Sequence, residues 1–285
     1  MILKNLKKIG TISIISSILL LIISFSSAVG ILASPGGFQV NMGAPQIYYG
    51  VVDVENIGDD TVNFVIENKK LLTDNIHLEF SDNGIAQWIS VHPNNFTLTP
   101  HSKKQVSFTV NIPSNVNYSD ALGALVINGY PVKNQQNIIN NSFQVQQVPQ
   151  IIVPIAVGFA GPIVESLSLI EKKIPSFLVT FMPGKFIYHA QNNGTVYANM
   201  TGNIKLNGWF NTDKINISGG VYPDDKYYLI GIWTPGLLDF GLYHTETTIN
   251  YGRYNQSQTI ISQDNIFVFP IWLIILYYPG LLFIF

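Results

Sequence analysis

Apolar and polar residues alternate with a period of two through most of the middle of this chain. The clearest run is Val106–Ile112, in which every second residue is apolar. Successive side chains of a β-strand point to opposite faces, so this spacing predicts a strand with one buried face. The members expected to point inward are Val106, Phe108, Val110 and Ile112, and those expected to face solvent are Ser107, Thr109 and Asn111. Similar apolar series, also expected to be buried, are Val52 and Val54; Val62, Phe64 and Ile66; and Ile76, Leu78 and Phe80.

Turn-forming residues separate these runs at short intervals. Asn56-Ile57-Gly58 and Asp82-Asn83-Gly84 are two such turns, and Pro113 stops the run described above. Short strands at this spacing are typical of a β-sandwich. Because a second series of alternating runs follows Gly161, we predict an all-β fold of two Ig-like β-sandwich domains in tandem, over residues 35–161 and 162–264.

Each half also contains a similar turn after a strand-like run. The first half has Glu55-Asn56-Ile57-Gly58, and the second has Gln191-Asn192-Asn193-Gly194. An Asn-x-Gly sequence is common in turns, so this short repeat adds only a little support for two related units.

The N-terminal segment is built like an export signal. Three lysines within residues 4–8 precede the apolar run Ile9–Phe25, and small residues allow a cut after Ala28. This order is typical of a secretory signal peptide, so residues 1–34 are predicted to be a signal peptide or, alternatively, an uncleaved signal anchor. In both cases the lysines stay inside and the rest of the chain is exported.

The C-terminal segment, residues 265–285, is apolar and carries no charge after Asp264. A helix of about 20 apolar residues spans a bilayer core, so a transmembrane helix is predicted here. The alternative is a buried, β-rich tail, since Phe, Ile, Val and Tyr favour strands. The predicted protein is therefore a single-pass membrane protein with its ectodomain outside the cell and the lipid bilayer as one partner.

Composition excludes several functions. Between residues 35 and 265 there are 12 basic and 17 acidic residues, so no basic surface for nucleic acid is expected. The absence of cysteine excludes zinc-thiolate sites, iron–sulfur clusters and cysteine nucleophiles. The chain also lacks the sequence motifs of the common hydrolases and nucleotide-binding enzymes. We predict no catalytic residue, metal site or cofactor; a glycan-active enzyme with two paired carboxylates is a remote alternative.

Scattered polar residues offer few other candidate sites. The five histidines have no metal-ligand spacing within one predicted strand. Acidic turns at Asp59-Asp60, Asp82-Asn83-Gly84 and Asp224-Asp225 are interpreted as solvated turn residues, with calcium binding as the alternative. Trp88 and Trp233 lie in strand-like runs and are predicted to belong to the cores.

Asn-x-Ser/Thr sequences are the most specific chemical signal in the chain. They are acceptor sequences for N-glycosylation in exported proteins. All seven lie between the two apolar ends, which predicts a glycoprotein if the source organism glycosylates; the candidate residues are Asn95, Asn117, Asn140, Asn193, Asn199, Asn216 and Asn255.

Several stretches share the local pattern of a known family: residues 52–58, 98–113, 121–127 and 153–157 of the first half, and residues 192–196, 221–223 with Trp233, 240–243 and 266–272 of the second. With the order of segments, they resemble the WxL-interacting protein family of cell-wall-anchored surface proteins. The resemblance implies one domain linked to wall polymer and one that binds a host or partner protein, and it implies no specific binding residue.

The predicted function is that of a membrane-anchored cell-surface protein. Its Ig-like domains are expected to bind cell-envelope polymer or another surface protein in a structural or adhesion role. The alternative is a chaperone-like assembly factor for surface proteins or pili, in which an open sheet edge accepts a strand from a client.

Overall fold

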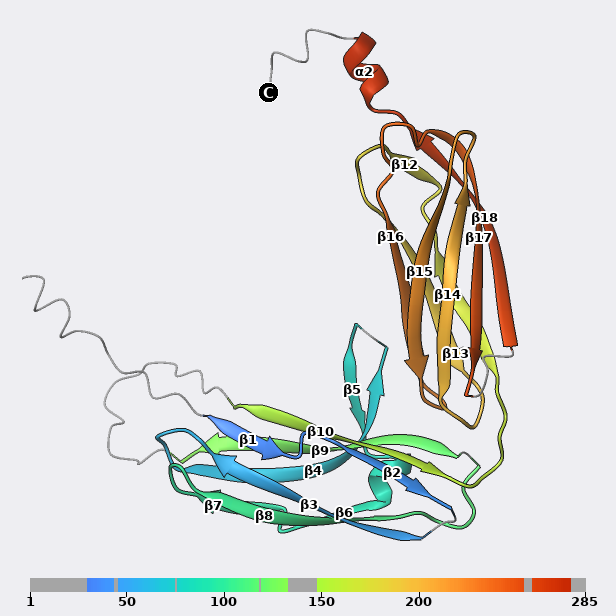
Figure 1. The fold of residues 1–285 in the computed structure, drawn as a ribbon. Coiled ribbons are helices and arrows are strands. Elements are labelled where there is room, and N and C mark those ends of the chain that lie inside the picture. Colours follow the sequence, from blue (N-terminus) through green and yellow to red (C-terminus); the bar gives the residue numbers. More distant parts are fainter. Residues whose placement is uncertain are drawn as a thin grey trace, which may run out of the picture.

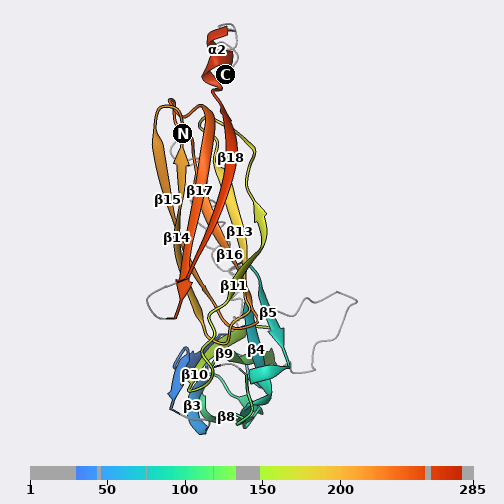
Figure 2. The same ribbon diagram turned by 90° about the vertical axis from the view of Figure 1, so that its right-hand side faces the viewer.

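The fold consists of two β-sandwiches joined end to side. The structure is a computed structural model and describes residues 30–43, 46–74, 76–117, 119–132, 148–253 and 258–277. In Figure 1 the two sandwiches form the arms of an L, with the first sandwich lying flat and the second upright. Figure 2 shows the first sandwich end-on below the second.

The first sandwich packs a four-stranded sheet against a six-stranded one. The four-stranded sheet has the order β1 (Ile31–Ser34), β3 (Ile47–Asn56), β8 (Lys103–Asn111) and β6 (Ile89–His92). The other sheet has the order β2 (Phe38–Met42), β10 (Gln150–Phe159), β9 (Asp120–Pro131), β4 (Val62–Thr73) and β5 (Leu78–Ser81), and β7 (Asn95–Leu98) also pairs with β4. A 3-10 turn, η1, spans Gly84–Gln87.

The second sandwich packs a three-stranded sheet against a five-stranded one. The smaller sheet has the order β11 (Leu167–Lys173), β13 (Gly184–Asn192) and β16 (Lys226–Trp233). The larger has the order β12 (Phe177–Val179), β18 (Gln258–Phe269), β17 (Gly241–Gly252), β14 (Ala198–Asn207) and β15 (Thr212–Val221). A six-residue helix, α2 (Trp272–Tyr277), follows β18.

Each sandwich closes its own apolar core. Val106, Phe108, Val110 and Ile112 are all buried in the first, as their alternation predicts. Trp88 lies in the first core and Trp233 in the second, which confirms their predicted places. The predicted all-β fold is therefore confirmed. A third tryptophan, Trp209 in the turn between β14 and β15, is exposed and belongs to neither core.

The two repeated turns contain buried asparagines that close each sandwich. In the first, Asn56 is fully buried, and its Nδ2 donates to the carbonyl oxygens of Asp60 at 2.7 Å and Thr99 at 3.1 Å. In the second, Asn192 donates to the carbonyl oxygens of Val196 at 2.8 Å and Val221 at 2.9 Å. Each asparagine Oδ1 also accepts a backbone N–H from the glycine two residues on. The short sequence repeat thus corresponds to the same turn, closed by a buried asparagine, in both sandwiches.

The predicted transmembrane helix at residues 265–285 is not supported by the described residues, which end at Tyr277. Its first residues end strand β18, in which Ile266 and Val268 are fully buried and Phe267 between them is 44% exposed. Uncharged Ile, Phe and Val satisfy a strand in a sandwich core as well as a helix in lipid, so hydropathy alone did not separate the two. In the part of the chain that the structure describes, no helix has the length and apolar character needed to cross a bilayer. The predicted single-pass localisation is therefore wrong.

The predicted N-terminal signal falls largely on residues 1–29, which lie outside the described residues. The first described strand, β1, begins at Ile31 and pairs with β3, four residues ahead of the predicted domain start at Pro35. Between the last strand of the first sandwich and the first strand of the second lies the segment around Gly161, where the domain boundary is predicted.

Candidate functional site

The β4–β5 hairpin extends beyond the first sandwich. Strand β4 pairs with β9 as far as Lys70, and its last residues pair only with β5. In Figure 1 this hairpin projects alongside the base of the second sandwich, on the inner side of the L. We call this region, where the hairpin meets strand β16, the elbow.

The apolar face of the hairpin is exposed, which contradicts the sequence-based prediction. Ile76, Leu78 and Phe80 were expected to be buried by their alternation, yet they are 53%, 48% and 36% exposed. Leu78 and Phe80 lie in β5, at the edge of its sheet, and Ile76 precedes that strand; none of the three belongs to the buried core of the first sandwich. Large exposed apolar groups in a cluster often mark a binding surface.

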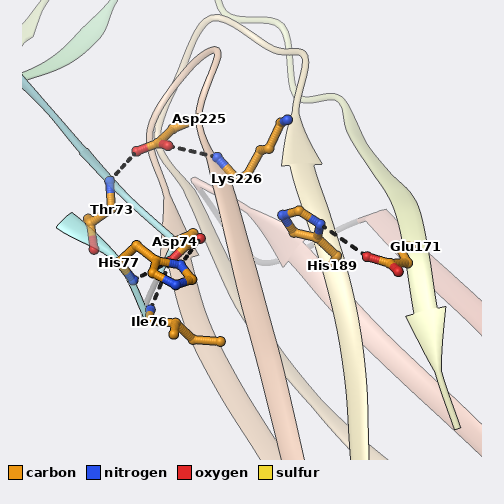
Figure 3. Close-up of polar contacts among 8 residues, drawn as sticks. All are labelled: Thr73, Asp74, Ile76, His77, Glu171, His189, Asp225 and Lys226. Carbon is orange, nitrogen blue, oxygen red and sulfur yellow. Dashed lines mark hydrogen bonds and ion pairs between the residues drawn. The ribbon is translucent and has the colours of Figure 1, made fainter. Parts of the chain in front are cut away.

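The tip of the hairpin is hydrogen-bonded to the second sandwich. The Thr73 N–H donates to Asp225 Oδ2 at 3.1 Å, and the Tyr228 N–H donates to the Asp74 carbonyl oxygen at 2.9 Å. Figure 3 shows Thr73 and Asp74 facing the start of β16. The turn itself is held by Asp74 Oδ1, which accepts the N–H groups of Ile76 at 2.9 Å and His77 at 2.6 Å.

Asp225 is a structural residue of the elbow rather than the solvated turn residue predicted from the sequence. It is buried, and its Oδ1 accepts the Lys226 N–H at 2.8 Å. Burial raises the pKa of the Asp225 carboxyl, while its hydrogen bonds oppose this rise. Sequence reasoning missed this residue because its main partner, Thr73, is 152 positions away.

A second set of contacts ties the sandwiches together beside the elbow. The buried Asp120 accepts the Tyr197 N–H at 2.7 Å and lies 3.4 Å from the Arg253 guanidinium. The Ser119 N–H donates to the Thr195 carbonyl oxygen at 2.7 Å. A cavity between the two sandwiches has a volume of about 10 Å³, and its lining includes Leu71, Asp120, Tyr222 and Asp225. It has room for one water at most, so it is not a pocket for a larger ligand.

Strand β16 presents a free edge at the elbow. The N–H of Tyr228 points away from β13 toward Asp74. Backbone groups alternate in direction along a strand, so those of Ile230 and Ile232, two and four residues further on, point the same way. No strand of the described chain pairs with β16 on this side. The side chains of Ile230 and Ile232 are 36% and 56% exposed, whereas Leu229 and Trp233 point into the core. The elbow therefore offers both a backbone edge and apolar side chains.

His189 packs behind this edge. Its ring stacks on Tyr228 with centroids 3.9 Å apart. Its Nδ1 lies 3.9 Å from a carboxylate oxygen of Glu171, as Figure 3 shows. Its Nε2 is buried with no hydrogen-bond partner among the described residues. Burial, with a further contribution from the nearby Lys226 charge, lowers the pKa of His189. The ring is thus favoured in its neutral form and acts as a packing surface for Tyr228.

The other acidic turns do not gather around a common centre. His101 lies 3.4 Å from Asp59, and Lys69 lies 2.8 Å from Asp82. Within the described ranges no three His, Asp or Glu side chains are arranged to hold a metal ion. Glu246 and Asp264 line one polar hollow, but they face opposite sides of their sheet because Glu246 pairs with Gln263 and Asp264 with Thr245. They are therefore not placed as the acid and base of a glycosidase.

Five of the seven candidate glycosylation residues are described, and all five are exposed: Asn95, Asn117, Asn193, Asn199 and Asn216. Asn140 and Asn255 lie outside the described residues. In the Asn117 sequence, Ser119 is fully buried and its hydroxyl donates to the Pro162 carbonyl oxygen at 3.0 Å. Glycosylation stays a prediction at all seven residues.

Comparisons with known proteins give distant structural similarity. No family model and no curated protein matches the chain. The class 5 fimbriae chaperone CfaA is 14% identical, with 82% of this chain and 99% of that chain covered and a TM-score of 0.42. The CsuC–CsuE chaperone–tip subunit complex of Acinetobacter baumannii Csu pili gives 11% identity, 85% and 99% coverage and a TM-score of 0.39. The Salmonella enterica SafA pilin–SafB chaperone complex gives 13% identity, 83% and 97% coverage and a TM-score of 0.40.

These findings correct the predicted main function. The similar structures are pilus chaperones, in agreement with the alternative prediction and not with an adhesion protein that binds wall polymer. The adhesion prediction relied on a membrane anchor at residues 265–285, but residues 265–269 belong to strand β18. The resemblance to WxL-interacting proteins is not tested by these comparisons and stays a prediction. At such low identities and TM-scores, function has to be argued from the geometry of this chain.

Proposed function

We propose that the protein is a chaperone-like assembly factor that holds an extended segment of a partner surface protein by strand addition at the elbow. The observation that carries this proposal is the free edge of β16, where Ile230 and Ile232 expose both backbone and side chain. The proposed activity is recognition without bond making or breaking.

The backbone of β16 supplies the first part of the recognition. An extended peptide binds an exposed sheet edge through main-chain hydrogen bonds, and its alternate side chains give specificity. The bond from the Tyr228 N–H to the Asp74 carbonyl oxygen is one backbone contact that this edge already makes outside its own sheet, with the tip of the hairpin. A partner segment would continue in line from that bond along Ile230 and Ile232.

Exposed apolar side chains supply the second part. A strand laid along β16 would turn every second side chain toward the face that carries Ile230 and Ile232. The hairpin contributes Leu78 and Phe80 on an adjoining element. A client segment with alternating apolar residues fits this surface, and such segments are the ones that aggregate when they are left unpaired.

The test uses a labelled synthetic peptide in which valine alternates with threonine, with lysine at both ends for solubility. We expect the native chain to bind it, as measured by fluorescence anisotropy. Ile232→Pro removes one free edge N–H and one apolar side chain without breaking a bond to β13, so binding should weaken at least about tenfold, the equivalent of one or two lost contacts.

The matched control is Ile261→Pro, which changes an exposed isoleucine on the free edge of β18, in the other sheet of the same sandwich. This variant changes the other open edge of the second sandwich, so it should keep the binding that belongs to the elbow. Absence of binding to the native chain would overturn the proposal. Equal loss in the two variants would show that the peptide does not recognise the elbow.

A further inference from the structure

Strand β18 has a long free edge on the side of the second sandwich away from β16 (Figure 1). Strand β17 pairs with it from Gln258 to Val268, but β12 covers its other side only at Phe267–Phe269. The Phe267 N–H donates to the Ser176 carbonyl oxygen at 2.9 Å, so odd-numbered residues of β18 direct their backbone groups outward. Thr259, Ile261, Gln263 and Asn265 therefore present unpaired strand edge in the described part of the chain.

This edge carries little protection against pairing. Proteins commonly blunt exposed edges with charged side chains, proline or bulges. The outward residues Thr259–Asn265 include no proline, and Ile261 is 63% exposed. Lys172 reaches Asp264 Oδ1 at 2.7 Å and Ser262 Oγ at 3.3 Å, but both belong to the even-numbered, inward-facing set. The lysine thus neutralises Asp264 and leaves the backbone edge open.

We propose that β18 pairs with β18 of a second copy of this chain, antiparallel about a two-fold axis at Ser262. In this register Ile261 lies opposite Gln263 of the second copy, and Thr259 lies opposite Asn265. All four outward residues then form backbone hydrogen bonds, and residues of the same face stay together, as a sheet requires. The two five-stranded sheets become one continuous sheet.

The edge is complementary to itself. Each outward cross-strand pair joins two uncharged side chains, so no like charges oppose each other, which would destabilise the pairing. On the inward face Ser262 meets its own copy, and Asp264, already paired with Lys172, lies opposite Ile260. A two-fold interface requires this kind of self-complementarity. The dimer would leave the elbow free, because β16 lies on the opposite side of the sandwich (Figure 1).

The absence of cysteine makes a register test direct, since any single cysteine variant has one thiol per chain. Ser262→Cys should form a disulfide-linked dimer under mild oxidation, because its mate lies directly opposite at a Cα separation of about 4.5–5.5 Å, within the range that a disulfide spans. The control is Thr259→Cys, whose copy lies about 20 Å away across the axis at ~3.3 Å per residue, too far for a bond.

Sedimentation velocity tests the association itself. The native chain should show concentration-dependent dimers, and Ile261→Pro or Ile261→Lys should raise the dimer dissociation constant at least tenfold; the lysine variant serves if the proline variant fails to fold. A native chain that stays monomeric at its highest soluble concentration overturns the proposal. Cross-linking at Thr259→Cys as strong as at Ser262→Cys overturns the register and with it the two-fold pairing.

Discussion

Strands β8 and β5 have the same sequence pattern and opposite environments. In β8 the alternate apolar residues face the core, and Phe108 is 1% exposed. In β5 the alternate residues Leu78 and Phe80 face outward at an edge. Alternation therefore reports that a strand has an apolar face, but it does not report what covers that face. On the hairpin the described chain leaves this face partly exposed.

The largest effect expected from this comparison is on the stability of the first sandwich. Phe108→Ala should lower the free energy of unfolding by about 3–5 kcal/mol, through lost transfer energy and the cavity left behind. Phe80→Ala, the matched change on β5, should cost under about 1 kcal/mol because its ring already contacts solvent. Urea unfolding of the whole chain would measure both. Similar losses in the two variants would mean that the face of β5 is covered.

Buried asparagines extend the comparison to polar residues. Asn192→Ala should cost roughly 2–3 kcal/mol, since it leaves buried carbonyl groups and the Gly194 N–H without their partner. Asn216→Ala, on the exposed face of β15, should cost under about 0.5 kcal/mol. Thermal unfolding of the whole chain checks both. Equal melting temperatures for the two variants would contradict the interpretation of the repeated turn.

The smallest effect concerns His189, next to the elbow. Because burial lowers its pKa, its neutral form stabilises the fold above the unfolded pKa of about 6.5, and this contribution is lost as the pH falls below that value. The native chain should therefore lose stability as the pH falls below about 6.5, and His189→Asn should show a shallower decline over the same range. Midpoints of urea unfolding, measured for both proteins across this pH range, test this difference in slope. Parallel curves would place the titration elsewhere.

The parts of the fold that sequence predicts are those in which one segment decides its own environment. The seven-residue alternation around Phe108 and the strand-like runs of Trp88 and Trp233 predict burial correctly. Residues 266–269 do not, because four uncharged residues are compatible with a strand end and with lipid. The structure resolves this by pairing Val268 with Gly241 and Phe267 with Leu242.

The elbow could not be predicted from the sequence. Asp225 and Thr73 meet across 152 positions, and Tyr197 and Asp120 across 77. Each is ordinary in its local context: an acidic residue in a turn, or a residue at the end of a strand. Only the placement of two finished sandwiches brings them together, and no periodicity within either sandwich encodes that placement.

The length of β18 also sets a distance within the molecule. Twelve residues at ~3.3 Å each span about 40 Å, from the end of the second sandwich near the elbow to helix α2 at the other (Figure 1). The second sandwich thus separates helix α2 from the elbow. A label or surface attachment placed at α2 would report on orientation without touching a strand held at the elbow, which makes that end the natural point for immobilising the protein.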